Sequence, residues 1–245
     1  MKFTPATVLA LALIMNGANR ALGEGGSISG VIRLDKKTEA PRRAVIDMAS
    51  DPACAKQWDE RPPSERMIVG KDKGLMNVFV WVSKGMENRK FEPPKEAAQI
   101  NQVKCVYTPH VIGVMVGQEL KIKNSDATLH NVHIIPAENP AANVGQPGRG
   151  IINTFKFKKA ELDIYVKCDV HAWMNCRVHV IEHPYFAVTD AEGKFTIKGL
   201  PAGEYEISTL HEHKMYQADK DAIKVTVKEG EDAKVEVTYA PKKRD

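Results

Sequence analysis

A seven-residue segment, residues 168–174, collects three kinds of metal-binding side chain. Cys168 offers a thiolate, His171 an imidazole and Met174 a thioether, and His130, far upstream, can supply a second imidazole. Two histidines, one cysteine and a weak axial methionine are the ligand set of mononuclear blue-copper sites that transfer electrons. The sulfur ligands suit Cu(I), and the imidazoles keep Cu(II) acceptable. We therefore predict a site for one copper ion formed by these four residues.

The strands expected around these residues direct them toward the interior. In segment 162–167 every second side chain is apolar, and continuing that alternation places Cys168 on the apolar face. His130 has the same parity as the apolar residues that follow it, so it is also expected to face inward. His133 has the opposite parity and is not expected to be a ligand.

Three motifs within residues 99–182 carry a family resemblance. They are Asn124-Ser125-Asp126 leading into His130-Asn131-Val132, the segment Val116-Gly117-Gln118 before a strand, and Cys168-x-x-His171-x-x-Met174. Together they resemble the cupredoxins, and the short spacing between the last histidine and the methionine is similar to the amicyanin type of loop rather than the longer plastocyanin type. The resemblance implies a Greek-key β-sandwich in which His130, Cys168, His171 and Met174 bind copper.

The same resemblance implies roles for residues beside the ligands. Asn131 would support the first histidine, and His171 would be the ligand at the solvent edge, through which electrons enter and leave. Trp173 and Val170 would form part of an apolar patch around that histidine. Redox partner proteins are therefore expected to dock near His171 and Trp173. Cys176 is a departure from the family, in which this position is commonly a small residue.

Other sites built from these residue types fit the sequence less well than the copper site. A c-type haem needs Cys-x-x-Cys-His, a binuclear copper centre needs a second cysteine where Ala172 stands, and zinc accepts a thioether poorly. The four cysteines can instead form two disulfides, Cys54–Cys105 and Cys168–Cys176, in a protein that binds no metal. If Cys168 binds copper, Cys54–Cys105 is the natural bridge and Cys176 is left over.

The rest of the chain is patterned as β-strands, with no long helical periodicity. Strands are expected at 27–34, 76–82, 111–116, 119–123, 130–135, 162–167, 176–181, 186–189, 194–197, 205–210, 223–227 and 234–239. Residues 190–193 are expected to turn segment 186–197 into a hairpin, and residues 139–140 and 145–150 are expected to be loop. The predicted fold class is all-β, with two sandwiches.

Residues 189–205 resemble a second family. The runs Thr189-Asp190-Ala191-Glu192-Gly193 and Gly199-Leu200-Pro201-Ala202-Gly203 look like the carboxypeptidase regulatory, transthyretin-like sandwich, whose members are usually non-catalytic. Segment 27–32 resembles the start of such modules, so one hypothesis inserts the copper domain into a sandwich made from both ends of the chain. The predicted domains are a signal peptide at 1–23, an N-terminal β-rich segment at 24–98, a cupredoxin-like copper domain at 99–182 and a transthyretin-like β-sandwich at 184–240.

The N-terminus is patterned as an export signal. Lys2 precedes a short apolar run at 8–15, and small residues at Ala21 and Gly23 predict cleavage after Gly23. The apolar run is too short to span a bilayer, so no membrane span is expected in the mature chain. A periplasmic or otherwise exported location is therefore expected, where disulfides persist.

The charge balance argues against nucleic acid as a partner. The 245 residues carry 35 Lys and Arg against 31 Asp and Glu, a formal net charge of +4, which is too small to predict a basic binding face. His211 and His213 are expected to be a solvated pair. The sequence contains no second histidine-rich cluster for a substrate and no evident nucleophile–base pair, so an enzyme is not expected.

Three hypotheses for function follow from these observations. The first is an exported blue-copper protein that transfers one electron between larger redox proteins. The second is a copper storage or delivery protein that uses the same ligands. The third is a non-metal envelope module with two disulfides, whose sandwiches bind a protein or a glycan.

Overall fold

The computed structural model describes residues 25–242, so the predicted signal peptide lies outside the described residues. The described chain is nearly all β, with seventeen strands, a short α-helix, α1 (Pro52–Ala55), and a 3₁₀ turn, η1 (Lys71–Lys73). No helix in this part of the chain has the length and apolar character needed to cross a membrane. The predicted all-β class with two sandwiches is confirmed.

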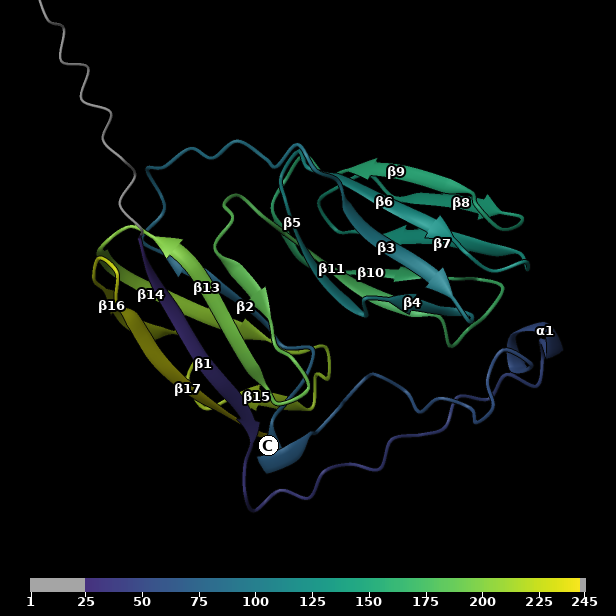
Figure 1. Cartoon of the computed structure of the whole chain (residues 1–245), viewed down its shortest axis with the longest axis horizontal. Coiled ribbons are helices and arrows are strands. Elements are labelled where there is room, and N and C mark those ends of the chain that lie inside the picture. The colour runs from purple at the N-terminus through teal and green to yellow at the C-terminus, as the bar shows by residue number, and fades with distance from the viewer. Residues whose placement is uncertain (1–24, 243–245) are drawn as a thin grey trace, which may run out of the picture.

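The first sandwich consists of two four-stranded sheets (Figure 1). One sheet has the order β13-β1-β17-β15, with bounds β13 (Lys194–Leu200), β1 (Gly26–Leu34), β17 (Asp232–Pro241) and β15 (Tyr216–Ala218). The other has the order β12-β2-β14-β16, with bounds β12 (Phe186–Val188), β2 (Phe79–Lys84), β14 (Gly203–Leu210) and β16 (Ile223–Val227). Both sheets therefore combine strands from the two ends of the chain.

The pairing of β1 explains how the two ends join. β1 runs antiparallel to β13 and parallel to β17, and its alternate residues Ile28, Ile32 and Leu34 are buried in the core of this sandwich. At Gly30 a Cβ atom would lie 2.0 Å from the carbonyl oxygen of Val235, so the close approach of the strands requires glycine here. The hypothesis that the N-terminal strand packs with the C-terminal sandwich, with the other domain inserted between, is confirmed by these pairings.

The second sandwich is formed by β3–β11, which follow one another without interruption. Its five-stranded sheet has the order β5-β11-β10-β7-β8, with bounds β5 (Val111–Met115), β11 (Asn175–Ile181), β10 (Glu161–Lys167), β7 (His130–Ile135) and β8 (Ala142–Gln146). Its four-stranded sheet has the order β4-β3-β6-β9, with bounds β4 (Val106–Thr108), β3 (Ala98–Val103), β6 (Glu119–Asn124) and β9 (Ile152–Lys156). The side chains of Cys168, Met174 and Cys176 belong to its buried core.

A long irregular segment between β1 and β2 starts and ends at the first sandwich but passes beside the second. It leaves the first sandwich at β1, reaches α1 beside the second sandwich, and returns to the first at η1 and β2 (Figure 1). The Asp51 carboxylate caps α1 by accepting hydrogen bonds from the N–H groups of Ala53 and Cys54. This segment therefore carries residues from outside the second sandwich to one end of it.

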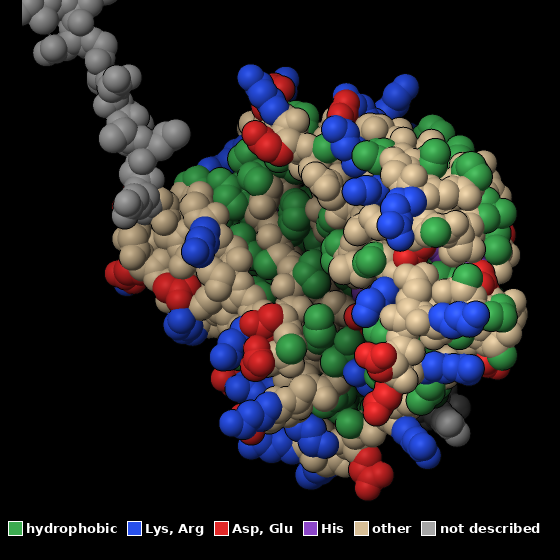
Figure 2. All heavy atoms as spheres, turned by 45° about the vertical axis from the view of Figure 1, so that its right-hand side comes forward, with side chains coloured by type: hydrophobic (Ala, Val, Ile, Leu, Met, Phe, Trp, Pro, Cys, Tyr) green, Lys and Arg blue, Asp and Glu red, His purple; other side chains and the backbone are tan. Residues whose placement is uncertain are grey.

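The two sandwiches also contact each other directly. Phe79 of β2 is fully buried with Val111 and Ile181 of the second sandwich, and its ring stacks on His179 at a centroid distance of 4.2 Å. Beside this cluster, the buried carboxylate of Glu212 pairs with Arg177 at 3.0 Å. Figure 2 shows hydrophobic side chains along a hollow between the two halves.

Three expectations about local structure are wrong. Segments 186–188 and 194–200 do not form a hairpin, because the turn at 190–193 passes from one sheet to the other, where β12 pairs with β2 and β13 with β1. Part of the expected loop is β8, which pairs with β7. His211 is not solvated but buried, and its pKa is lowered to about 4, mainly by that burial.

Replacing Phe79 tests the contact between the sandwiches. We expect Phe79→Ala to lower the free energy of unfolding by about 3–5 kcal/mol, because it removes a fully buried ring and leaves a cavity. Chemical denaturation followed by fluorescence measures the change. Met215→Ala is the control, since this side chain is exposed and a change within about 0.5 kcal/mol is expected. Equal stability of the two variants would contradict the assignment.

Candidate metal centre

His130 and Cys168 lie at the same end of the five-stranded sheet. His130 is the first residue of β7, and Cys168 directly follows the last residue of β10. Because β7 and β10 are antiparallel neighbours, the start of one lies beside the end of the other. Both side chains are buried, as the strand alternation predicts, whereas His133 lies outside the core and contacts the carboxylate of Asp169.

The loop after β10 folds back on itself and brings His171 to the same place. The backbone N–H of Cys168 donates to the carbonyl of Met174 at 3.0 Å, and the N–H of Met174 donates to the carbonyl of His171 at 2.9 Å. These two bonds close the loop into a compact turn. Met174 is buried in the same core cluster as Cys168.

The donor atoms of three predicted ligands converge. One ligand atom each from His130, Cys168 and His171 lies within 4.8 Å of the others, and all three residues are buried. The Nδ1 atoms of the two histidines are 3.1 Å apart, and the Sγ of Cys168 is 3.8 Å from Nδ1 of His171. The backbone N–H of Asn131 donates to the Cys168 sulfur at 3.4 Å, which gives this asparagine a supporting contact at the site.

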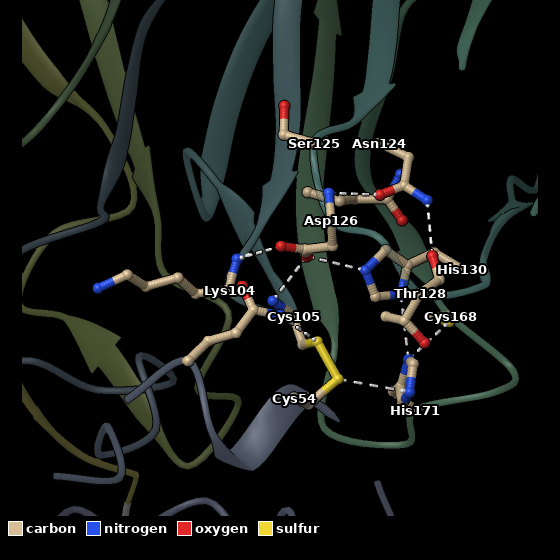
Figure 3. A network of polar contacts seen from close by, with 12 residues as sticks. Cys54, Lys104, Cys105, Asn124, Ser125, Asp126, Thr128, His130, Cys168 and His171 are labelled. Atoms are coloured by element: carbon tan, nitrogen blue, oxygen red, sulfur yellow. Dashed lines mark hydrogen bonds and ion pairs between the residues drawn. A yellow bond between two sulfur atoms is a disulfide. The ribbon is translucent and has the colours of Figure 1, made fainter. Parts of the chain in front are cut away.

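The outer nitrogen of each imidazole contacts a carboxylate, and Figure 3 shows the contact between His130 and Asp126. Nε2 of His130 lies 2.9 Å from Oδ2 of Asp126, and Nε2 of His171 lies 2.8 Å from Oδ2 of Asp51. A carboxylate only accepts hydrogen bonds, so in the neutral imidazoles it favours the proton on Nε2. In that form the Nδ1 atoms carry no proton, and their lone pairs, which can bind a metal, are directed toward Cys168.

The carboxylate of Asp126 is itself held by the backbone. The N–H groups of Lys104 and Cys105 donate to its two oxygens, each at 2.8 Å (Figure 3). Although burial raises the pKa of Asp126, the contacts with His130 and these N–H groups outweigh it and lower the pKa. The carboxylate is therefore ionised and oriented toward His130.

His171 is covered by the linker segment around α1. Asp51 contacts its Nε2. The Sγ of Cys54 on α1 lies 3.6 Å from the same nitrogen (Figure 3). A disulfide between Cys54 and Cys105 attaches α1 to the second sandwich. As a result His171 is only 1% exposed. The resemblance implies a histidine at the solvent edge, and in this structure that edge is closed by the α1 segment.

The histidines favour the thiolate form of Cys168. Burial by itself raises the pKa of this thiol, but the neighbouring imidazoles of His130 and His171 and the N–H of Asn131 lower it to about 6. Burial likewise lowers the pKa of His130, while Asp126 and Cys168 raise it to about 8. A thiolate, rather than a thiol, is the form that binds a metal.

The four cysteines divide as the copper hypothesis requires. Cys54–Cys105 is the disulfide, and Cys168 and Cys176 are free, so the alternative bridge Cys168–Cys176 is wrong. Cys176 faces the core of the sandwich, where burial raises the pKa of its thiol. Its side chain therefore behaves as a small apolar core residue.

Two acidic residues of the site were not predicted to belong to it. Asp126 belongs to a motif that carries the family resemblance but assigns it no role, and Asp51 lies in a segment whose pattern indicates only irregular structure. The available signal for Asp51 is its position before Pro52, which is typical of a helix N-cap. Nothing in that local pattern indicates a contact with a histidine 120 positions later.

Comparisons with known proteins gave the following matches. A family described as SpaA, a prealbumin-like fold domain, matches residues 156–241, which is less than half of the chain. The match includes β10 and β11 of the second sandwich as well as β12–β17 of the first. No curated protein matches the sequence.

Several solved structures match part of the chain. A purple cupredoxin from Nitrosopumilus maritimus is 21% identical over 34% of this chain and 98% of its own, with a TM-score of 0.30. The copper-containing nitrite reductase of Thermus scotoductus is 21% identical over 42% of this chain and 25% of its own, with a TM-score of 0.32. A mutant of amicyanin in its oxidised state is 24% identical over 36% of this chain and 86% of its own, with a TM-score of 0.32.

The titration of Cys168 is directly measurable in the metal-free protein. We expect ultraviolet absorbance from a thiolate to rise with a midpoint near pH 6, because the two imidazoles stabilise the charged sulfur. The transition should be absent from Cys168→Ser. Cys176 should not contribute in this range, since burial raises the pKa of its thiol. A midpoint at the ordinary cysteine value of about 8.5 would refute the assignment.

Proposed function

We propose that this protein binds one copper ion through His130, Cys168, His171 and Met174 and acts in one-electron transfer. The observation that carries the proposal is the buried convergence of two imidazole Nδ1 atoms and one thiolate. A nitrogen and sulfur donor set of this kind suits copper in both of its common oxidation states. Bound copper would supply the one-electron couple.

The residues present fit such an ion. In the neutral imidazoles the contacts of Asp126 and Asp51 with the Nε2 atoms leave the Nδ1 lone pairs for the ion, whose binding displaces the second proton of His130, and the environment favours the thiolate of Cys168. The donors lie on paired strands and a loop closed by hydrogen bonds, so their positions depend on a packed sandwich rather than on the ion alone. Ligands held in this way change little when the charge at the site changes, which favours fast electron exchange.

In this proposal the protein carries electrons between other proteins and does not itself catalyse a reaction. Redox partner proteins would dock near His171 and Trp173. Trp173 is half-buried, its ring lies 5.0 Å from that of His171, and its indole N–H donates to the carbonyl of Cys105 at 3.0 Å. Val170 in the same loop is exposed and apolar. Because α1 covers His171 itself, Trp173 and Val170 offer the more accessible surface.

A copper storage or delivery role is the second candidate. It is favoured by the burial of His171 under α1, because a covered histidine restricts the close contact with a partner protein that electron transfer needs. An exported location is part of either proposal. The disulfide Cys54–Cys105 supports it, since such bonds persist in oxidising compartments.

Addition of Cu(II) to the purified protein tests the metal site. We expect an intense visible band from charge transfer between the Cys168 thiolate and copper, and we expect Cys168→Ser to abolish it. Cys176→Ala is the matched control, because it removes the other free thiol and should leave the band in place. A colourless wild-type protein, or a band that depends on Cys176, would overturn the proposal.

Met174 is tested through the redox potential. Met174→Gln replaces a soft thioether with a harder amide oxygen, which favours Cu(II), so we expect a lower potential with copper binding retained. Redox titration of the visible band measures it. An unchanged potential would argue against Met174 as an axial ligand. Rapid surrender of copper to a chelator by the wild-type protein would favour delivery over electron transfer.

A further inference from the structure

A second group of metal-binding side chains lies on the outer side of the two imidazoles. Ligand atoms of Asp51, Cys54 and His171 lie within 4.8 Å of one another, and the same holds for Cys105, Asp126 and His130. The disulfide between Cys54 and Cys105 joins the two groups (Figure 3). Two sulfurs and two carboxylates therefore meet at the Nε2 edges of the histidines, and the Nδ1 atoms face Cys168.

The two carboxylates are held in place without help from the disulfide. Asp126 accepts the N–H groups of Lys104 and Cys105, and Asp51 accepts those at the start of α1. Asp51 also accepts the hydroxyl of Thr128 at 3.4 Å. Breaking the sulfur–sulfur bond removes none of these contacts directly, so both carboxylates stay directed toward the place where the two sulfurs lie.

The chemistry of this group depends on the state of its sulfurs. In the disulfide neither sulfur can become a thiolate, which is the form of cysteine that binds metals. A dithiol reductant transfers two electrons and two protons to the bond, so Cys54 and Cys105 become thiols and the reductant becomes a disulfide. Both thiols then release their protons when they bind a metal ion. Two adjacent thiolates suit Cu(I).

We propose that reduction of Cys54–Cys105 creates a second metal site, in which the two thiolates bind Cu(I) beside the carboxylates of Asp51 and Asp126. This site lies on the Nε2 side of the two imidazoles, and the site containing Cys168 lies on their Nδ1 side. It does not require the first site to be occupied, so it goes beyond the proposed function. In the oxidised protein both sulfurs are fully buried.

The same reduction opens a path to the site. The disulfide is the covalent link between α1 and the second sandwich, and Pro52 and Ala53 on the outer side of α1 are exposed. The remaining attachments of this segment are the packing of Met48, Ala55 and Trp58 on the core of the second sandwich and polar contacts such as that of the Trp58 indole N–H with the carbonyl of Lys104 at 2.8 Å. Reduction therefore leaves only non-covalent contacts between this segment and the sandwich, so the segment can move aside to admit an ion and return to its place against His171 and Thr128.

The test is the number of Cu(I) ions bound by the full protein in its two disulfide states. The protein is reduced with dithiothreitol under inert gas, freed of reductant, and titrated with Cu(I) against a chromogenic chelator. Opening of the bridge is verified by counting alkylated thiols by mass spectrometry. We expect the reduced protein to bind one equivalent more than the oxidised protein. Equal binding by both forms, with the bridge shown to be open, would overturn the proposal.

Variants separate this site from the first one. Cys168→Ser should bind one Cu(I) ion fewer than the wild type in both disulfide states, and it should still bind one more ion when its disulfide is reduced. A missing copper site at Cys168 is therefore distinguishable from a missing site at Cys54 and Cys105. The double variant Cys54→Ser with Cys105→Ser should bind as the oxidised wild type does. An extra equivalent in that variant after the same treatment would place the ion elsewhere. Circular dichroism verifies the fold of the double variant. If the variant does not fold, the comparison of oxidised with reduced wild-type protein still tests the proposal.

Discussion

Two imidazoles buried at one end of a β-sandwich impose a hydrogen-bonding requirement that organises their surroundings. A buried N–H without an acceptor is costly, so each outer nitrogen needs a polar partner. Asp126 provides the acceptor for His130, and the turn at Lys104 and Cys105 holds that carboxylate in turn. For His171 the acceptor is Asp51, from a segment that precedes the second sandwich. The path of the linker is thus coupled to the orientation of the site.

The discontinuous first sandwich makes this coupling achievable. Because β1 and β2 both belong to that sandwich, the chain between them begins and ends at the same body and is free to extend across the neighbouring one. It uses this freedom to place Asp51 and Cys54 against His171, and the disulfide with Cys105 secures the segment there. The contact between the sandwiches through Phe79 limits their relative movement, which keeps the linker in reach of the site.

The strands of the site were predictable because their pattern is local. Alternation along 130–135 and 162–168 places His130 and Cys168 inside, and the structure agrees, although Leu162 is exposed where a bulge at Asp163, with φ of 61°, shifts the register. The supposed hairpin at 186–197 fails for a non-local reason. Its turn is tight, but each strand finds a better partner in a different sheet, and those partners come from the N-terminal part of the chain.

The sequence by itself determined the donor types, their inward direction and the all-β class, since period-two alternation and side-chain chemistry act over a few residues. Only the tertiary structure decided what lies on the outer edges of the imidazoles. There Asp51 and the Cys54–Cys105 disulfide replace the open edge that the family resemblance implies. The reason is physical: residues 35–78 are largely irregular, so their path depends on where hydrogen bonds, one covalent bond and the surrounding sandwiches allow them to lie.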